Sequence, residues 1–258
     1  MSFLRTLAER LSRGRTFRRK IVVSGKACPI VVSPDAQLKY LKPGSGVFDQ
    51  DLVRIAEQQL TADSVVWDIG ANVGVFTFAA DSVAHRGTVI SVEADIWLAN
   101  ILRRTARFKA YEGIDLRILP AAVSDQTGVA VFTVASRGRA SNALEAAGGR
   151  SQMGGVREKQ YVPTTTFDAM LASFPPPDFV KIDIEGAEVM AIRGGEKLLS
   201  EVRPVFYIEV GKSVSDTMLS TFRAARYAAF DPEGRHLTDT CASNTFFVPE
   251  EKAADWQA

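Results

Sequence analysis

The stretch VVWDIGANVGVFTFAAD, residues 65–81, joins two apolar segments through an acid and two glycines. The first segment is β-branched and predicts a buried strand, while the second predicts a helix. In open parallel sheets, ligands bind where a strand ends and the chain turns into the next helix. We therefore expect Asp68, Gly70, Asn72 and Gly74 to form a ligand-binding turn in which a Cβ at either glycine would intrude on the ligand.

The spacing of this turn narrows the choice of ligand. A dinucleotide fingerprint would need glycines where Asn72 and Val75 stand, and a phosphate-binding P-loop would need a Gly-Lys-Ser/Thr that is absent. The pattern D-x-G-x-x-x-G resembles the first motif of class I S-adenosylmethionine-dependent methyltransferases. The alternative is a plain strand–turn–helix joint in which the glycines serve only the backbone.

Composition and charge set the broad class of the chain. Its 258 residues are 46% hydrophobic, which fits an ordinary globular protein with one core. The 31 basic and 30 acidic side chains nearly cancel, so a nucleic-acid partner is not expected. Two cysteines, Cys28 and Cys241, stand far apart in sequence and argue against a disulfide framework or a zinc site. We expect a cytoplasmic protein.

The N-terminus carries a local excess of positive charge. Residues 1–20 hold seven Lys or Arg against one acid, and the apolar residues of 3–11 fall at helical spacing. This segment predicts either a basic amphipathic helix that contacts an anionic membrane peripherally or a solvated arm. The sequence contains no apolar run long enough to span a membrane and no signal-peptide core.

Strand-like and helix-like stretches alternate along the chain, which predicts a mostly parallel sheet covered by helices on both faces. The expected strands are residues 64–69, 87–93, 116–123, 178–184 and 203–210, with further strands at 129–135 and 243–249. The expected helices are residues 48–60, 95–110, 187–200 and 216–230. We divide the chain into a basic arm and lead-in over 1–45 and a single domain over 46–258, with a glycine-rich loop at 136–160.

Further candidate cofactor residues follow the next two strands. Glu93 ends the second strand 19 residues after Gly74, where an acid can accept hydrogen bonds from both ribose hydroxyls of an adenosine. Ser124 and Asp125 follow the third strand and could contact the adenine, although Asp125 could equally form a simple turn before Gly128.

Acids also gather at the end of the fourth strand. Lys181, Asp183 and Glu185 alternate with apolar residues and are expected to share one face of the strand. Unpaired charge is costly at the centre of a sheet, so Asp183 and Glu185 are candidate catalytic acids, with helix capping as the alternative for Glu185. Glu209 ends the neighbouring strand, and His236 is a candidate general base on a loop.

Together these motifs resemble the FkbM-type methyltransferases, which are mostly O-methylating enzymes of polyketide, glycan and glycolipid pathways. The resemblance rests on WDIGANVGVFT (67–77), VEAD (92–95), AAVSDQTG (121–128), TTTFD (164–168), FVKIDIEGAE (179–188), RPVFYIEV (203–210) and NTFFVP (244–249). It implies a Rossmann-like class I methyltransferase fold with a mostly parallel seven-stranded sheet, S-adenosyl-L-methionine as cofactor, and a small-molecule, glycan or lipid-linked acceptor.

Within that resemblance, Asp183 is the expected acceptor-side acid, acting either as a base or as an oxygen ligand for Mg²⁺, with Glu185 and Glu209 as partners. Whether a metal is used stays open. The alternative functions are an NAD-dependent oxidoreductase and a non-catalytic methyltransferase-like binding module.

Overall fold

The computed structural model describes residues 13–42, 44, 46–136, 138–147, 155–254 and 256. The helix expected from the apolar spacing of residues 3–11 lies outside the described residues, as do residues 137 and 148–154 of the expected glycine-rich loop at 136–160. Among the described helices, none is long and apolar enough to cross a membrane.

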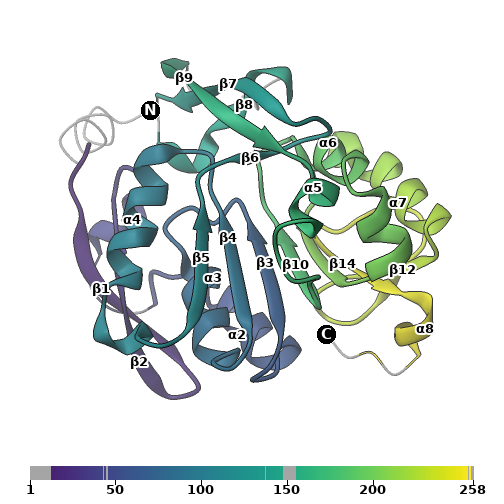
Figure 1. Cartoon of the computed structure of the whole chain (residues 1–258), viewed down its shortest axis with the longest axis horizontal. Helices are drawn as coiled ribbons and strands as arrows, with labels where there is room; N and C mark the ends of the chain where they lie inside the picture. The colour runs from purple at the N-terminus through teal and green to yellow at the C-terminus, as the bar shows by residue number, and fades with distance from the viewer. Residues whose placement is uncertain are drawn as a thin grey trace.

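A large twisted sheet forms the centre of the molecule (Figure 1). Its strand order is β13-β12-β14-β11-β10-β3-β4-β5, and β14 runs antiparallel to both of its neighbours. Seven of these strands make the mostly parallel Rossmann-like sheet that the sequence predicts, and the two-residue β13 extends its edge. The strands are β3 (Val65–Ile69), β4 (Thr88–Val92), β5 (Asp115–Leu119), β10 (Phe179–Ile182), β11 (Val205–Glu209), β12 (Tyr227–Phe230), β13 (His236–Leu237) and β14 (Asn244–Pro249).

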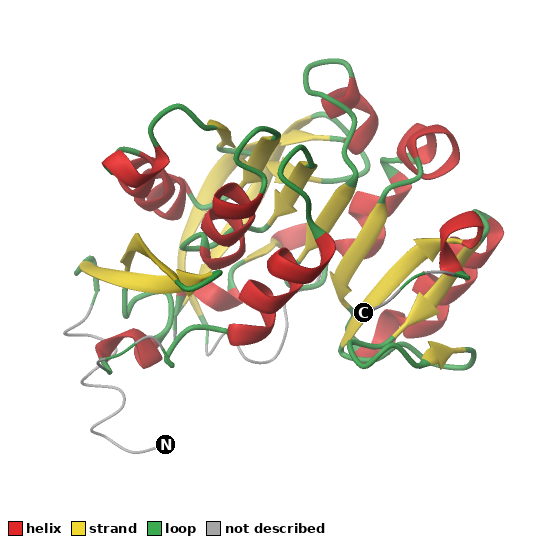
Figure 2. Ribbon diagram, turned by 90° about the horizontal axis from the view of Figure 1, so that it is seen from below, coloured by secondary structure: helices red, strands yellow, loops and turns green. Residues whose placement is uncertain are grey.

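Helices cover both faces of this sheet, as Figure 2 shows. Along β3, Val66 packs in the core on one face, whereas Trp67 and Ile69 pack in the core on the other. The first core includes α2 (Gln50–Gln59), α3 (Val75–Val83) and α4 (Ile96–Ala106). The second includes α5 (Phe167–Leu171), α6 (Glu188–Arg193), the π-helical turn Leu198–Val202 and α7 (Ser215–Ala224). Helix α8 (Glu250–Ala253) follows β14.

One expected helix was wrong in its second half. Residues 216–230 were expected to be helical throughout, but α7 ends at Ala224 and Tyr227–Phe230 form β12. Arg226 adopts a φ of 61°, which stops the helix and redirects the chain. Strand β12 then pairs with β14, and Tyr227 and Ala229 are buried. This pairing supplies the seventh strand of the sheet.

The expected strand 116–123 is divided between two sheets. It breaks at Pro120 into β5, which belongs to the central sheet, and the short β6 (Ala122–Val123), which belongs to a second sheet. Strands β6, β9 (Val156–Thr165), β7 (Gly128–Ala135) and β8 (Ala143–Leu144) form a four-stranded sheet that lies over the end of the central sheet at which β4 and β5 finish (Figure 1). Part of the expected loop 136–160 is therefore strand, and this second sheet can roof a ligand site.

The lead-in segment contributes a hairpin to the core. Strands β1 (Phe17–Val23) and β2 (Lys26–Val32) pair antiparallel, and their buried side chains join the core that includes α3 and α4. Ile21, Ile30 and Val32 are almost fully buried. The hairpin therefore packs as part of the molecule described here.

Candidate active site

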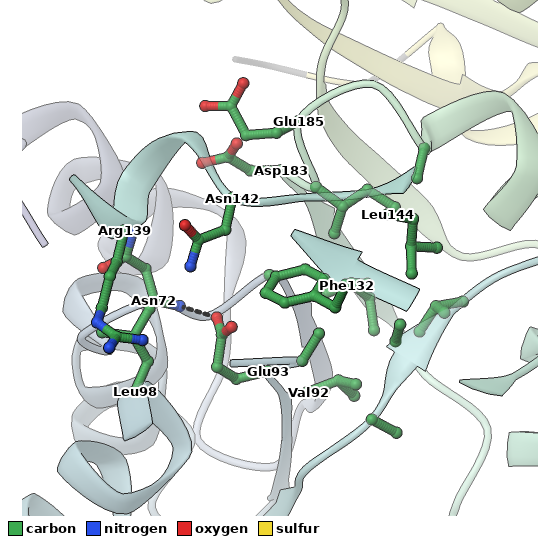
Figure 3. A pocket seen from close by; sticks show the side chains of 18 of the residues that line it. Asn72, Val92, Glu93, Leu98, Phe132, Arg139, Asn142, Leu144, Asp183 and Glu185 are labelled. Carbon is green, nitrogen blue, oxygen red and sulfur yellow. Dashed lines mark hydrogen bonds between the residues drawn. The ribbon is translucent and has the colours of Figure 1, made fainter. Parts of the chain in front are cut away.

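A cavity opens at the carboxyl ends of β3, β4, β10 and β11, beneath the four-stranded sheet (Figure 3). Its empty volume is about 790 Å³, part of which is open to solvent, and this lies in the range of small-molecule sites. Its walls combine apolar side chains with a few polar ones. The candidates that line it are Gly70, Asn72, Glu93, Asp183, Glu185 and Glu209.

The two glycines of the turn are needed by the protein's own packing. Gly70 has a φ of +78°, and a Cβ there would lie 1.9 Å from the carbonyl oxygen of Asp183. Gly74 has a φ of +89°, and its Cβ would meet the side chains of Phe78 and Leu102 at 2.6–2.8 Å. The first obstacle to a Cβ at both positions is the chain itself, so the glycines serve the backbone, and the intrusion of a Cβ on a ligand stays a prediction.

Glu93 lies on the cavity floor with both carboxylate oxygens fixed by backbone donors. The N–H of Asn72 donates to Oε2 at 2.7 Å (Figure 3), and the N–H of Asp95 donates to Oε1 at 2.8 Å. Burial dominates and raises the pKa of Glu93 to about 7. The side chain is thus held in one orientation, with lone pairs left to accept from a ligand.

Asp68 lies beneath the turn and does not line the cavity. Its Oδ2 accepts from the Thr77 hydroxyl at 2.6 Å, and its Oδ1 lies 3.3 Å from the ammonium nitrogen of Lys181. Lys181 also donates to the carbonyl oxygen of Gly70 at 2.9 Å. Burial opposes the charge on Lys181, but the carboxylates of Asp68 and Asp183 outweigh it and hold the pKa of Lys181 above its usual value. Asp68 therefore positions the turn from below.

Asp183 and Glu185 come from the turn that follows β10. The strand ends at Ile182, earlier than expected, and Glu185 has a φ of 51°, so the two acids do not continue the alternation of a strand. Asp183 stays on the side of Lys181, with Oδ2 at 3.8 Å from its nitrogen. Figure 3 shows Asp183 and Glu185 on one side of the cavity and Glu93 with Asn72 on another. Glu209, at the end of β11, also lines the cavity.

The four-stranded sheet and its connecting turns, which form the roof of the cavity, contain a buried charged network that the sequence pattern does not predict. Arg139 donates to Asp35 Oδ2 at 3.2 Å and pairs closely with Asp95, and its guanidinium lies 4.7 Å from the centre of the Trp97 ring. Asn142 donates to Asp95 Oδ2 at 2.8 Å. Arg139 and Asn142 both line the cavity. Arg139 and Asn142 stand in the glycine-rich stretch 136–160, which has no strand or helix periodicity, so no local sequence pattern indicated them as site residues.

Three expected site residues lie elsewhere. Ser124 is buried and Asp125 is exposed just beyond β6, and the cavity wall there is made by the preceding residues Ala121, Ala122 and Val123. His236 is exposed on β13, where its ring contacts Phe230 at the edge of the sheet. The structure does not bring these three side chains to the cavity.

The sequence model of the methyltransferase FkbM domain matches residues 68–228, which is more than half of the chain and contains the turn, Glu93 and the acids after β10. The chain belongs to the FkbM methyltransferase family.

Solved structures with similarity to this FkbM family member share little sequence with it. A methyltransferase FkbM from Methylobacillus flagellatus KT is 17% identical, with a TM-score of 0.48, and the match covers 74% of this chain and 46% of that chain. An S-adenosylmethionine-dependent O-methyltransferase from Thermotoga maritima is 11% identical, with a TM-score of 0.43 and coverages of 90% and 77%. The chain thus spans less than half the length of the Methylobacillus protein. No curated protein matches the sequence significantly.

The FkbM domain offers polar groups that suit S-adenosylmethionine. Asn72 Oδ1 is buried without a hydrogen-bond partner among the described residues and belongs to a cavity-lining side chain, so it is available to a ligand donor. Glu93 supplies a fixed acceptor, and Val92, Phe132 and Leu144 supply apolar surface. Across the described ranges, no group of three or more His, Cys, Asp or Glu is arranged to hold a metal ion.

Proposed function

We propose that the chain is an S-adenosylmethionine-dependent O-methyltransferase that acts on a hydroxyl group of a glycan, a glycolipid or another secondary metabolite. The observation that carries the proposal is the placement of Glu93 and Asp183 in one cavity, on different walls. Glu93 is fixed to accept ribose hydroxyls, and Asp183 stands where an acceptor hydroxyl can approach. Family membership and the absent dinucleotide fingerprint weigh against an NAD-dependent oxidoreductase.

In this proposal Glu93 and Asn72 hold the adenosine and the backbone at Gly70 lies against the donor. Bound S-adenosylmethionine would supply a methyl group that its sulfonium already activates. The acceptor hydroxyl has to lose a proton as its oxygen is methylated, and Asp183 accepts that proton. Arg139, Asn142 and the strands of the roof cover the site and restrict the entry of water, so the protein contributes mainly by positioning.

The donor half of the proposal is tested by calorimetric titration with S-adenosylhomocysteine and, separately, with NAD. The wild-type chain should bind the former and not the latter. Glu93→Ala should weaken S-adenosylhomocysteine binding by roughly tenfold or more, because hydrogen bonds to a charged carboxylate contribute about 1.5–3 kcal/mol. The exposed Glu201→Ala variant is the matched control and should bind as the wild type does. Equal affinity in both variants would contradict the assignment of Glu93.

The catalytic half is tested by incubation with S-adenosylmethionine and a panel of hydroxyl-bearing glycans and glycolipids, with mass spectrometry to detect one added methyl group. Methylation that is lost when the acceptor hydroxyls are blocked by acetylation would support O-methylation. Donor binding with no methylation of any extract, including the natural metabolite pool of the source organism, would favour the non-catalytic binding module instead.

A further inference from the structure

Three arginines converge on a surface groove that shares no residue with the cavity. Arg18 comes from β1, and Arg104 and Arg107 come from the C-terminal end of α4. The groove has an empty volume of about 610 Å³ and is open to solvent. Thr16 and Phe108 also line it. We call this feature the arginine groove and define it by these five residues.

Two contacts hold the guanidinium groups in place. Arg104 Nη2 donates to the Thr16 hydroxyl at 3.1 Å. The Arg18 guanidinium lies 4.3 Å from the centre of the Phe108 ring, which is a cation–π distance. Arg18 and Arg104 are therefore partly ordered before any ligand arrives.

Among the described residues, no acid compensates the charges of the arginine groove. Within the part of the chain that the structure describes, none of Arg18, Arg104 and Arg107 forms an ion pair. Arginines elsewhere in the molecule are commonly matched, as Arg203 is by Glu251 and Arg235 by Asp231. In a chain with a net charge of only +1, this groove is a local concentration of unmatched positive charge.

Helix electrostatics explain only part of the cluster. Cations near the C-terminus of a helix interact favourably with its dipole, which accounts for Arg104 and Arg107 at the end of α4. The dipole does not account for Arg18, which a separate strand brings to the same groove. Like charges that converge from two elements repel one another unless an anion lies between them.

We propose that the arginine groove binds a phosphate group. Guanidinium groups recognise phosphate with paired, charge-assisted hydrogen bonds, and the Thr16 hydroxyl adds a donor. The phosphate can belong to an anionic phospholipid headgroup or to a free phosphate compound, since both present the same chemistry to the groove. The inference does not depend on the proposed methyl transfer, because no residue of the groove lines the cavity.

The test uses the full chain and two probes. The first is cosedimentation with vesicles of phosphatidylcholine, with or without phosphatidylglycerol, and the second is calorimetric titration with inorganic pyrophosphate. The variant Arg104→Gln/Arg107→Gln removes two charges from the arginine groove. The control Arg193→Gln/Lys197→Gln removes two exposed charges from the region of α6, which packs on the opposite face of the sheet. Thermal melts establish that both variants fold.

The groove variant should lose roughly 10- to 30-fold in affinity for whichever probe binds, since each basic residue near an anionic surface contributes about a fivefold factor. The control should bind as the wild type does. Binding to phosphatidylglycerol vesicles alone assigns the site to a headgroup, and binding to pyrophosphate assigns it to a free phosphate. The proposal is overturned if neither probe binds, or if the groove variant and the control lose affinity equally. If the groove variant and the control lose affinity equally, the net charge of the protein or the basic residues that precede Thr16 would account for binding.

Discussion

The ammonium nitrogen of Lys181 lies 3.3 Å from Asp68 Oδ1, and both side chains are buried. The same nitrogen reaches the Gly70 carbonyl at 2.9 Å and Asp183 Oδ2 at 3.8 Å. One lysine on β10 thus connects the turn after β3 with the acid proposed to receive the acceptor proton. Sequence spacing alone placed Lys181 on the face of Asp183 but gave it no role.

Replacing Lys181 by Met should leave Asp68 buried without its charge partner. Breaking one side of a buried pair typically costs about 3–5 kcal/mol of unfolding free energy, which urea denaturation measures. The double variant Lys181→Met/Asp68→Asn should recover part of that loss. As a control, Arg86→Met breaks an exposed pair with Asp63 and should cost less than about 1 kcal/mol. Equal losses in the buried and exposed pairs would contradict this role of Lys181.

Asp183→Asn keeps the shape of the side chain and removes its charge. If Asp183 receives the acceptor proton, kcat should fall by roughly 10² to 10⁴, which is typical of lost acid–base assistance. Affinity for S-adenosylhomocysteine should change little, since Glu93 and Asn72 hold the donor. The exposed Asp216→Asn variant serves as the control for both measurements. Loss of donor affinity with unchanged turnover would place Asp183 in the donor pocket instead.

Donor binding should weaken as the pH falls through 7. Burial raises the pKa of Glu93 to about 7, so the folded protein protonates this carboxylate below that value. Protonation removes the charge that accepts the ribose hydroxyls. Affinity for S-adenosylhomocysteine should therefore drop by roughly tenfold between about pH 8 and about pH 6. Glu93→Gln should bind weakly with little dependence on pH, and a steep dependence in that variant would show that another group titrates.

Asp81 on α3 should make the protein less stable as the pH rises. Its side chain is fully buried, neither oxygen has a hydrogen-bond partner among the described residues, and burial raises its pKa from 3.8 to about 7. Between these two values the folded state holds the proton more firmly than the unfolded state, so unfolding free energy decreases with increasing pH. Asp81→Asn should reduce that slope and be about 1–3 kcal/mol more stable than wild type at about pH 8. Asp216→Asn, which removes an exposed carboxylate, should leave the slope unchanged.

Gly70→Ala should destabilise the protein more than a positive φ alone explains. Its Cβ would overlap the carbonyl oxygen of Asp183, whereas Gly113 has a similar φ of +85° with no atom within 4 Å of a Cβ. Gly113→Ala should cost about 1 kcal/mol from backbone strain, and Gly70→Ala about 1–3 kcal/mol more from the overlap. Denaturant unfolding of both variants measures the difference, and equal losses would mean that the turn relaxes around the added methyl group.

The local pattern of hydrophobic residues was sufficient to predict most strands of the central sheet. The β-branched runs at β3, β4, β10 and β11 are short, apolar and followed by helical periodicity, so each specifies a parallel strand. Strand β12 was missed because RAARYAAF has the alanine content of a helix, and only its pairing with β14 decides the conformation. The break at Pro120 was missed for the same reason, since the partner of β6 is the distant β9.

The candidate site likewise contains residues that local spacing predicts and residues that only distant contacts bring together. The turn and Glu93 follow from a spacing within one strand–helix–strand unit, and the structure brings Glu93 to the turn through the Asn72 N–H. Ser124 and Asp125 were expected at the cavity, but the residues just before them, Ala122 and Val123 of β6, line it instead. Arg139 could not be found from sequence, since its partner Asp35 is 104 residues away.

Asp35 is buried between two guanidinium groups, those of Arg139 and Arg157, which belong to the roof and its sheet. It precedes the segment matched by the family model, while both arginines lie within it. Without the β1–β2 hairpin and the turn that follows it, Arg157 would lose its carboxylate partner and Arg139 would keep only Asp95, so the roof would lose an ionic link to the rest of the molecule. Any natural or engineered exchange of cavity roofs between relatives should therefore succeed only when the matching N-terminal segment is transferred with it.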